Sequence, residues 1–488
     1  MRFGWPGRRA IAALALGAVA AFGQAPVGAW YLTLLAMAAL IALLCRAAPL
    51  AALWLAWLAG AGYFAAALNW IVQPFMVDAA KDGWMAPFAV LFMACGMALF
   101  WAAAAAVALR FRNRALAFAL ALTLADLARG YVLTGFPWAL LGHVWIDTPV
   151  AQLAALVGPS GLSLLTLLLA AALSGRKPLQ VSLAAMALAA AWGFGLWQLA
   201  QPVPPAPGIT LRLVQPNAAQ QAKWDPDLAA QFFNRLLAFT AVKPAPDLVI
   251  WPETALPYLL DYHPELAGMI ATAGGGAPVA VGMQRVEGDR YWNSLAILTA
   301  DGRQAAVYDK HHLVPFGEYI PFGDTLFDWM NISAFASKSG NGYTAGLGPQ
   351  LLDLGPKLGH VLPLICYEAV FPQDLRGTAR PDWLLQVTND AWFGRLTGPF
   401  QHAAQARLRA IEQGLPLVRV ANTGVTAVYD ARGRETASLP FEVAAYLDAA
   451  LPGALPATPY ARFGEGPLLV LLACLALALI APLRRHRP

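Results

Sequence analysis

The chain has 488 residues, of which 59% are hydrophobic and only 12% are charged, with a mean hydropathy of +0.53. Soluble globular proteins carry about 25% charged residues, so this composition excludes an ordinary soluble protein and indicates a membrane protein. The net charge of +5 does not indicate a nucleic-acid partner, because the basic residues lie in short clusters at the ends of apolar runs.

Apolar runs recur along the chain and approach the roughly 20 residues that a helix needs to cross a bilayer. The first run is short and follows Arg8 and Arg9, as in a secretory signal peptide. Because further runs follow it, we expect it to be retained. We predict seven transmembrane helices in residues 1–200 and a C-terminal transmembrane helix with a basic cytoplasmic tail at 466–488. The runs are about 10–24, 27–45, 48–72, 84–109, 115–133, 150–174, 178–200 and 466–483.

Basic residues cluster at alternate ends of these runs. Every cluster therefore falls on one side of the membrane, which the positive-inside rule assigns to the cytoplasm. The sequence predicts a multi-pass cytoplasmic-membrane protein whose segment 201–465 lies on the opposite side. The clusters comprise Arg2, Arg8, Arg9, Arg46, Arg110, Arg112, Arg114, Arg176, Lys177, Arg484, Arg485 and Arg487.

Ionisable residues are scarce inside the runs, which favours an anchor or platform over a transporter. Asp126 and Arg129 are spaced i, i+3 on a predicted helix, and we expect them to pair. The loop that follows carries three aromatic residues that we expect at the membrane interface, namely Phe136, Trp138 and Trp145.

A proline-rich stretch at 201–208 predicts a semi-rigid linker to a second domain at 209–465. In this domain short β-like runs alternate with helical stretches, which indicates one α/β domain. The expected helices are about 227–241, 264–273 and 400–413. The expected strands are 209–214, 247–251, 278–283, 294–298, 304–308, 360–366, 383–387, 417–420 and 425–429.

Three of these strands end beside chemically reactive residues. Glu253 follows one, Lys310 follows another, and Cys366 ends a third. Ligand chemistry gathers at the carboxyl ends of strands in α/β sheets. A thiol is mostly protonated at neutral pH, so a carboxylate that accepts its proton and a lysine that favours the thiolate would make Cys366 a nucleophile. A second carboxylate, Glu318, could hold the lysine in place.

The remaining cysteines and the histidine pair predict no further site. Cys45, Cys95 and Cys474 lie in apolar runs, so a disulfide framework is not expected in the second domain. His311 and His312 are adjacent, and adjacent side chains on a strand point to opposite faces. We therefore expect no metal site there, and no cofactor.

The motifs resemble those of the nitrilase superfamily, and of its membrane-anchored branch, the apolipoprotein N-acyltransferase family. The superfamily's Glu-Lys-Cys triad is similar to Glu253 in WPETALP, Lys310 in KHHLVPFGEYIP and Cys366 in CYE. The segments KWDP and VTNDAWFG also match, and the resemblance covers essentially the whole chain. It implies an αββα sandwich, on the periplasmic side of a bacterial inner membrane, beside a multi-span helical bundle.

The resemblance further implies acyl transfer in two steps. Cys366 takes an acyl chain from a membrane phospholipid as a thioester, and the α-amino group of an N-terminal diacylglyceryl-cysteine of an apolipoprotein then takes it as an amide. Glu253 acts as base, Lys310 and the Tyr367 N–H support the oxyanion, and Glu318 orients them. The resemblance also implies that Trp224, Tyr367 and Glu368 are needed for activity, although the sequence offers no account of Glu368. The expected partners are thus the phospholipid donor, the apolipoprotein acceptor and the membrane, with no nucleic acid, and we expect a monomer.

A long loop at 319–345 carries apolar side chains between glycines and serines, which suggests a lid that dips into lipid. Phe322 and Trp329 are its expected lipid contacts, together with Trp224 outside it. A core flap over the domain is the alternative for this loop. Two other functions stay open, a membrane-tethered nitrilase-type amidase acting on a small amide and a transporter with an accessory domain.

Overall fold

The computed structural model describes residues 7–220, 223, 225–321 and 342–484, which form two compact units. The helical unit contains residues 1–202, 395–404 and 457–488. The sheet unit contains residues 203–394 and 405–456. The first boundary falls within the predicted linker at 201–208.

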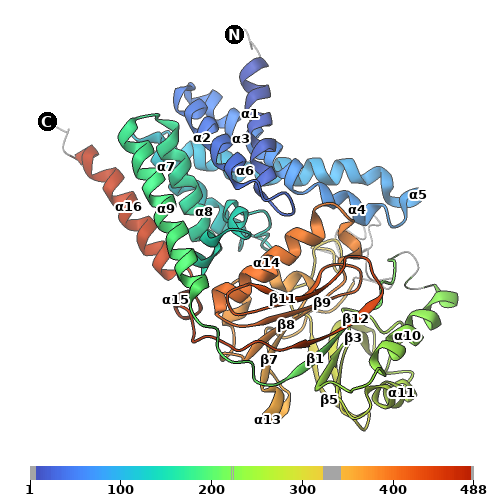
Figure 1. Cartoon of the computed structure of the whole chain (residues 1–488). Helices are drawn as coiled ribbons and strands as arrows, with labels where there is room; N and C mark the ends of the chain where they lie inside the picture. The colour runs from blue at the N-terminus through green and yellow to red at the C-terminus, as the bar shows by residue number, and fades with distance from the viewer. Residues whose placement is uncertain (1–6, 221–222, 224, 322–341, 485–488) are drawn as a thin grey trace. The chain divides into compact units, whose positions relative to one another are not determined.

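Long apolar helices build the helical unit, and each predicted run overlaps one of them (Figure 1). Among the described residues, four segments are long and apolar enough to cross a membrane, at 49–67, 79–108, 149–174 and 178–200. Helices Trp30–Arg46 and Gly466–Leu479 are apolar but shorter. The main helices are α1 (Gly7–Ala20), α2 (Trp30–Arg46), α3 (Pro49–Ala67), α6 (Ala86–Ala108), α7 (Arg114–Arg129), α8 (Ala154–Ser174), α9 (Pro178–Ala200) and α16 (Gly466–Arg484), with the short α4 (Val72–Phe75), α5 (Ala79–Asp82) and α15 (Pro459–Phe463).

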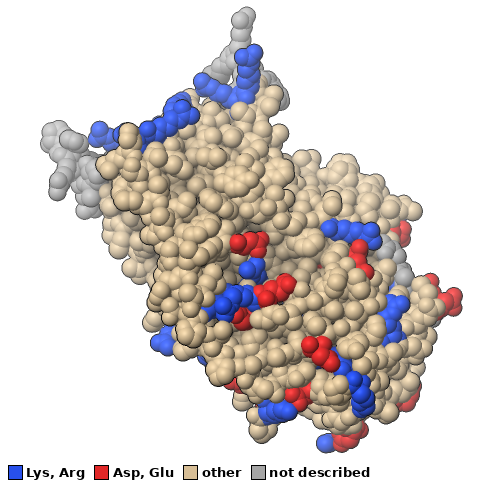
Figure 2. All heavy atoms as spheres, viewed as in Figure 1, with Lys and Arg blue, Asp and Glu red and all other residues tan. Residues whose placement is uncertain are grey.

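Basic side chains gather at one end of the helical unit, as Figure 2 shows. The exposed Arg8, Arg46, Arg110 and Arg176 lie near the start of α1 and the ends of α2, α6 and α8. These helix termini share one end of an up-and-down bundle. Such an asymmetry is the pattern from which membrane orientation is predicted.

Small residues let the helices approach closely. A Cβ atom on Gly17 of α1 would lie 1.8 Å from the carbonyl oxygen of Ala59 in α3. A Cβ atom on Gly62 of α3 would lie 2.1 Å from the carbonyl oxygen of Leu14. The backbones of α1 and α3 therefore touch at glycines, as is common where membrane helices associate.

The C-terminal helix α16 returns to pack against α7 and α8 (Figure 1). Its Leu468 and Leu472 form one apolar cluster with Leu120 of α7 and Leu164 of α8. The two ends of the chain thus contribute to one helical unit.

The loop after α7 differs from its prediction. Asp126 and Arg129 do pair, at 3.3 Å, and Arg129 also donates to the carbonyl oxygens of Phe136 and Trp138. However, Trp138 and Trp145 are buried rather than placed at a lipid-facing surface. Their indole N–H groups donate to Gln401 and Thr166 within the same unit, and these internal partners make burial of the rings favourable.

Two six-stranded sheets form the core of the sheet unit, in the orders β12-β1-β2-β3-β4-β5 and β11-β10-β9-β8-β7-β6. They face each other, with β1 against β9 and β4 against β7. The strands are β1 (Thr210–Gln215), β2 (Leu248–Ile250), β3 (Val279–Glu287), β4 (Arg290–Leu298), β5 (Gln304–Asp309), β6 (Leu352–Asp353), β7 (His360–Ile365), β8 (Trp383–Thr388), β9 (Leu417–Ala421), β10 (Thr426–Tyr429), β11 (Glu435–Leu439) and β12 (Ala445–Ala450).

Helices cover the outer faces of both sheets, which completes the predicted αββα sandwich (Figure 1). Phe233 of α10 (Pro226–Thr240) and Ile270 of α11 (Glu265–Gly274) pack on β1, β2 and β3. Ala406 and Ala410 of α14 (Gly398–Gln413) pack on β7, β8 and β9. The central strands β2, β8 and β9 are buried along their whole length, as expected for strands covered on both faces, although β8 carries Gln386 and β9 carries Arg419.

The close contact between α1 and α3 can be tested by adding one methyl group. Gly17→Ala should lower the free energy of unfolding by about 1–3 kcal/mol, because the new Cβ has no room beside Ala59. Gly96→Ala in α6 is the matched control, since a Cβ there meets no atom within 4 Å. Thermal unfolding in detergent measures both, and equal transition temperatures would contradict the predicted difference.

Candidate active site

Glu253 occupies a tight turn directly after β2 and is buried. Its Oε1 accepts a hydrogen bond of 2.7 Å from Asn293 Nδ2, and its Oε2 accepts one of 2.8 Å from the backbone N–H of Asn389. Gly282 of β3 allows this turn to lie close, because a Cβ there would be 2.0 Å from the carbonyl oxygen of Pro252. Both carboxylate oxygens of Glu253 are therefore fixed in direction.

Lys310 follows β5 and is almost fully buried. Its Nζ lies 2.8 Å from Glu318 Oε2 and 3.4 Å from Glu253 Oε1. Burial alone would lower the pKa of this ammonium, but Glu318 and then Glu253 outweigh burial and raise it. Lys310 is therefore a permanent cation at neutral pH, and Glu318 is the nearer of its two carboxylate partners.

Asn293 of β4 joins the two carboxylates, and the sequence did not single it out. Its Nδ2 donates to Glu253 Oε1 at 2.7 Å and to Glu318 Oε1 at 3.0 Å. The only signal in the sequence is one amide within the apolar strand RYWNSLAIL. An amide donor between two acids separates their negative charges without adding a charge of its own.

Cys366 follows β7 and has a backbone φ of +52°, which is unusual for a residue with a side chain. Burial, and then the charge of Glu253, raise the pKa of its thiol, while Lys310 and a hydrogen bond with Thr388 act in the opposite direction. The resting sulfur is thus a protonated thiol whose electrostatic neighbours are the predicted base and the predicted cation.

A buried ion pair between Arg419 and Asp390 supports the backbone of Cys366 through Gln386. Gln386 Nε2 donates to the carbonyl oxygen of Cys366 at 3.0 Å, and Gln386 Oε1 accepts from Arg419. Arg419 pairs with Asp390, which also accepts from Thr388 at 3.1 Å. These contacts therefore link the carbonyl oxygen of Cys366 to its own thiol, because Thr388 also hydrogen-bonds with the sulfur. Thr388 and Asp390 lie in the segment VTNDAWFG that carries part of the resemblance, whereas the sequence did not single out Gln386 or Arg419.

Glu368 is a fully buried hub between the cysteine and the lysine. Its Oε2 accepts from the backbone N–H of Ile365 at 2.6 Å. Its Oε1 accepts from the hydroxyl of Tyr308 at 2.9 Å and from the backbone N–H of His311 at 2.8 Å. Glu368 therefore ties the turn that carries Cys366 to the loop that carries Lys310, which gives this residue the positioning role that its sequence context did not reveal.

The histidine pair corrects an expectation. β5 ends at Asp309, so His311 and His312 do not alternate on a strand, and both rings turn toward Asp374. The side chain of His311 also lies 2.6 Å from Glu368. Burial lowers the pKa of His311, but Asp374 and Glu368 outweigh burial and raise it to about 9.

The other predicted residues divide into two groups. Tyr367 is buried, with its ring edge-on to Phe371 at 4.9 Å, and its N–H as an oxyanion donor stays a prediction. Trp224, Phe322 and Trp329 lie outside the described residues, as does most of the expected lid. Lys223, which the sequence reasoning missed, donates from a buried position to Thr254 Oγ1 at 2.6 Å. Burial lowers its pKa to about 8.

Together these residues form a dry nucleophilic site. A thiol, a carboxylate that can accept its proton and a permanent cation meet at the carboxyl ends of β7, β2 and β5. This arrangement can attack a carbonyl carbon and stabilise the resulting oxyanion. It suits acyl transfer through a thioester.

Comparison with known proteins places the two units in named families. A family model described as apolipoprotein N-acyltransferase N-terminal domain matches residues 16–172, and one described as carbon-nitrogen hydrolase matches residues 210–458. The chain is 41% identical to an apolipoprotein N-acyltransferase from Caulobacter vibrioides, over 86% of this chain and 84% of that protein. It is 38% identical to one from Bradyrhizobium diazoefficiens, over 99% and 96%.

Solved structures resemble about half of this chain more distantly. A CN-hydrolase superfamily protein from Xanthomonas campestris is 21% identical, with a TM-score of 0.37, over 50% of this chain and 90% of that chain. An amidase from Nesterenkonia sp. is 17% identical, with a TM-score of 0.38, over 56% and 98%. The family models and the curated relatives carry the family assignment.

The electrostatic link between Lys310 and Cys366 can be measured through thiol alkylation. In a chain with Cys45, Cys95 and Cys474 changed to serine, Cys366 should react slowly with iodoacetamide at neutral pH and faster as pH rises, because only the thiolate reacts. Lys310→Met should raise the thiol pKa further and slow alkylation about tenfold or more at each pH. The exposed Lys357→Met is the control, and a K310M rate equal to its rate would refute the link.

The hub role of Glu368 predicts a large loss of stability. Glu368→Ala leaves the N–H groups of Ile365 and His311 and the Tyr308 hydroxyl without their buried acceptor, which should cost about 3 kcal/mol or more of the free energy of unfolding. Glu287→Ala, at an exposed position, should cost less than about 0.5 kcal/mol. Chemical denaturation of both variants tests this, and similar losses would rule out the hub.

Proposed function

The chain belongs to the apolipoprotein N-acyltransferase family, and from this premise we propose how its site N-acylates lipoproteins. Cys366 takes an acyl chain from a membrane phospholipid as a thioester. The free α-amino group of an N-terminal diacylglyceryl-cysteine then takes the chain as an amide. The observation that carries this proposal is the buried cluster of Lys310, Glu253 and Glu318 beside a cysteine with positive φ.

In the first step Glu253 accepts the proton of the Cys366 thiol as the sulfur attacks the ester carbonyl. Both groups are buried, so this proton transfer takes place away from bulk water. The developing oxyanion lies near the Lys310 ammonium, with the Tyr367 N–H as the proposed second donor. When the tetrahedral intermediate collapses, the lysophospholipid alkoxide leaves and takes the proton from Glu253.

In the second step the acceptor amine attacks the thioester carbonyl, and Glu253, again a carboxylate, accepts a proton from the nitrogen. Collapse of this intermediate expels the Cys366 sulfur and restores the thiol. Lys310 keeps its charge through both steps, because Glu318 and Glu253 raise its pKa. Glu318 and Asn293 do not react in this scheme, and they keep the base and the cation in place.

Burial of the site favours transfer over hydrolysis. Glu253, Lys310, Glu318 and Cys366 are each at most 6% exposed. A thioester held there meets little water and persists until an amine arrives. Trp224, Phe322 and Trp329 are the residues that we propose contact the lipid chains.

The protein is a membrane protein, and we propose that it resides in the inner membrane of a two-membrane bacterium. The basic residues at alternate helix ends favour a cytoplasmic location for that end of the bundle. The segment that holds the site then lies on the periplasmic side, where lipoprotein N-termini are exposed. A single copy contains every group that the mechanism uses, so we propose a monomer.

An acyl-enzyme experiment tests the mechanism. Wild-type protein incubated with phospholipid carrying a labelled acyl chain should retain about one equivalent of label in a hydroxylamine-sensitive bond. Cys366→Ala should retain none, while Cys474→Ser, at an exposed position, should label like wild type. Equal labelling of C366A would disprove the thioester.

The same experiment separates a transferase from an amidase or other hydrolase. With phospholipid alone, a transferase should stall after about one turnover, because no amine collects the acyl group. A hydrolase should release fatty acid continuously. Continuous release by the wild type would favour the alternative function.

A further inference from the structure

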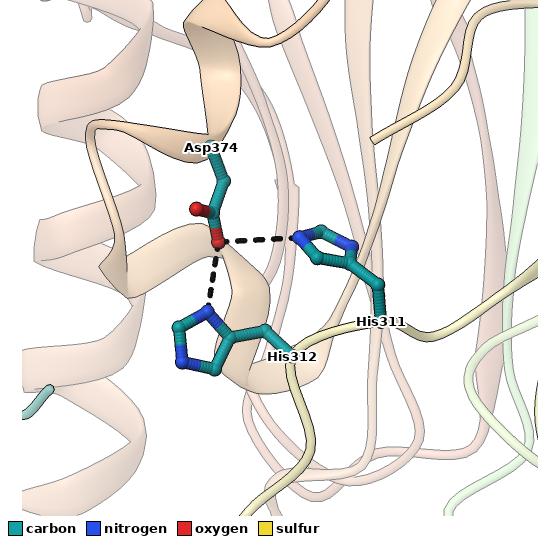
Figure 3. A group of neighbouring side chains, drawn as sticks. All are labelled: His311, His312 and Asp374. Carbon is teal, nitrogen blue, oxygen red and sulfur yellow. Dashed lines mark hydrogen bonds and ion pairs between the residues drawn. The ribbon is translucent and has the colours of Figure 1, made fainter. Parts of the chain in front are cut away.

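A cluster of possible metal ligands lies beside the Lys310 loop, and the proposed acyl transfer uses none of them as a reacting group. His311 and His312 come from this loop, and Asp374 comes from the short helical turn Asp374–Arg376. Figure 3 shows both rings directed at the Asp374 carboxylate. Each residue offers one ligand atom, and these three atoms all lie within 4.8 Å of one another.

Contacts on the far side of each ring hold the two histidines in these orientations. His311 Nδ1 lies 2.6 Å from Glu368 Oε1, so Nε2 is the nitrogen that faces Asp374. That Nε2 is buried and makes no hydrogen bond within the described part of the chain. The His312 ring stacks on Phe371 with centroids 3.5 Å apart and an interplanar angle of 16°. The rings of His311 and His312 are therefore already oriented to bind a ligand.

The distances between ligand atoms fit a small tetrahedral ion. Zinc binds histidine nitrogen at about 2.0–2.1 Å and carboxylate oxygen at about 2.0–2.2 Å, which places neighbouring ligand atoms about 3.3 Å apart. The Asp374 Oδ2 atom lies 2.9 Å from His312 Nδ1 and 3.4 Å from His311 Nε2. The two histidine nitrogens lie within 4.8 Å of each other, so a modest approach of the two rings would bring all three atoms to bonding distance of one ion.

The negative charges of Glu368 and Asp374 would also be balanced by a bound cation. Glu368 is fully buried and Asp374 is largely buried. In the described residues, neither carboxylate pairs with a lysine or arginine, and their only ion-pair partners are the two histidines. One divalent ion would balance both negative charges. Glu368 would then be the carboxylate that orients a metal-bound histidine through its other nitrogen.

From this geometry we propose that His311 Nε2, His312 Nδ1 and Asp374 Oδ2 bind one divalent transition-metal ion of the zinc class. The ion fastens the loop of Lys310 to the segment that follows the Cys366 turn. Its role is to hold these two segments together, and it takes no part in bond making. This inference does not depend on the acyl-transfer proposal, because occupancy and stability are its readouts.

Metal titration of the full-length protein tests the site. Protein purified in detergent and stripped with a chelator should bind one Zn²⁺ per chain by calorimetry, and Co²⁺ should give the intense visible absorption of tetrahedral coordination. The bound ion should raise the unfolding temperature. Asp374→Asn and His312→Gln should each weaken Zn²⁺ binding about 10-fold or more, as loss of a contact at a metal site does.

A matched control comes from a similar pair elsewhere in the sheet unit. His360 Nδ1 lies 3.6 Å from Asp382 Oδ2 at an exposed position, so His360→Asn should leave Zn²⁺ binding unchanged. The two cluster variants come from different segments, and each is compared with wild type in its metal-free unfolding temperature. Failure of the stripped wild type to bind Zn²⁺ would overturn the site and leave a proton on His311 as the cation. Equal affinity in D374N, H312Q and wild type would overturn it as well.

Discussion

The ammonium of Lys310, buried between Glu318 and Glu253, is the interaction on which the site depends. A buried charge is expensive unless it is paired and hydrogen-bonded. Two segments must therefore arrive together before the charge is tolerated, the turn after β2 that carries Glu253 and the loop after β5 that carries Lys310 and Glu318. Asn293 and Glu368 then connect this group to the neighbouring strand and to the cysteine turn. Folding of the sheet unit and assembly of the site are thus one event.

Residues at strand ends were predictable from the sequence. Glu253, Lys310 and Cys366 each follow an apolar run, and the carboxyl ends of such strands are where reactive side chains gather. Asn293, Gln386 and Arg419 were not found, because each lies inside a strand and its neighbours give no hint of which face it occupies. Their roles depend on contacts between strands, and only the folded sheet defines those contacts.

Fold predictions succeeded for the central strands and failed for some strands at the sheet edges. The central strands β8 and β9 were predicted nearly to the residue, whereas β11 and β12 at the sheet edges were missed because their exposed and buried positions mix. In the helical unit, aromatic character suggested an interface for Trp138 and Trp145. Both rings are instead buried, because their indole N–H groups find hydrogen-bond acceptors in distant segments. The histidines were misjudged because β5 ends one residue before Lys310.

The positive φ of Cys366 has a consequence for how such a protein can change over time. A residue with a side chain in the left-handed region costs on the order of 1–2 kcal/mol relative to glycine. The proposed nucleophile is thus held in a conformation that the local sequence disfavours, and the surrounding hydrogen bonds must supply the difference. Replacement of this cysteine by glycine would remove the conformational cost together with the sulfur. Selection for robustness alone would therefore erode activity, so the chemistry itself must keep this cysteine in place.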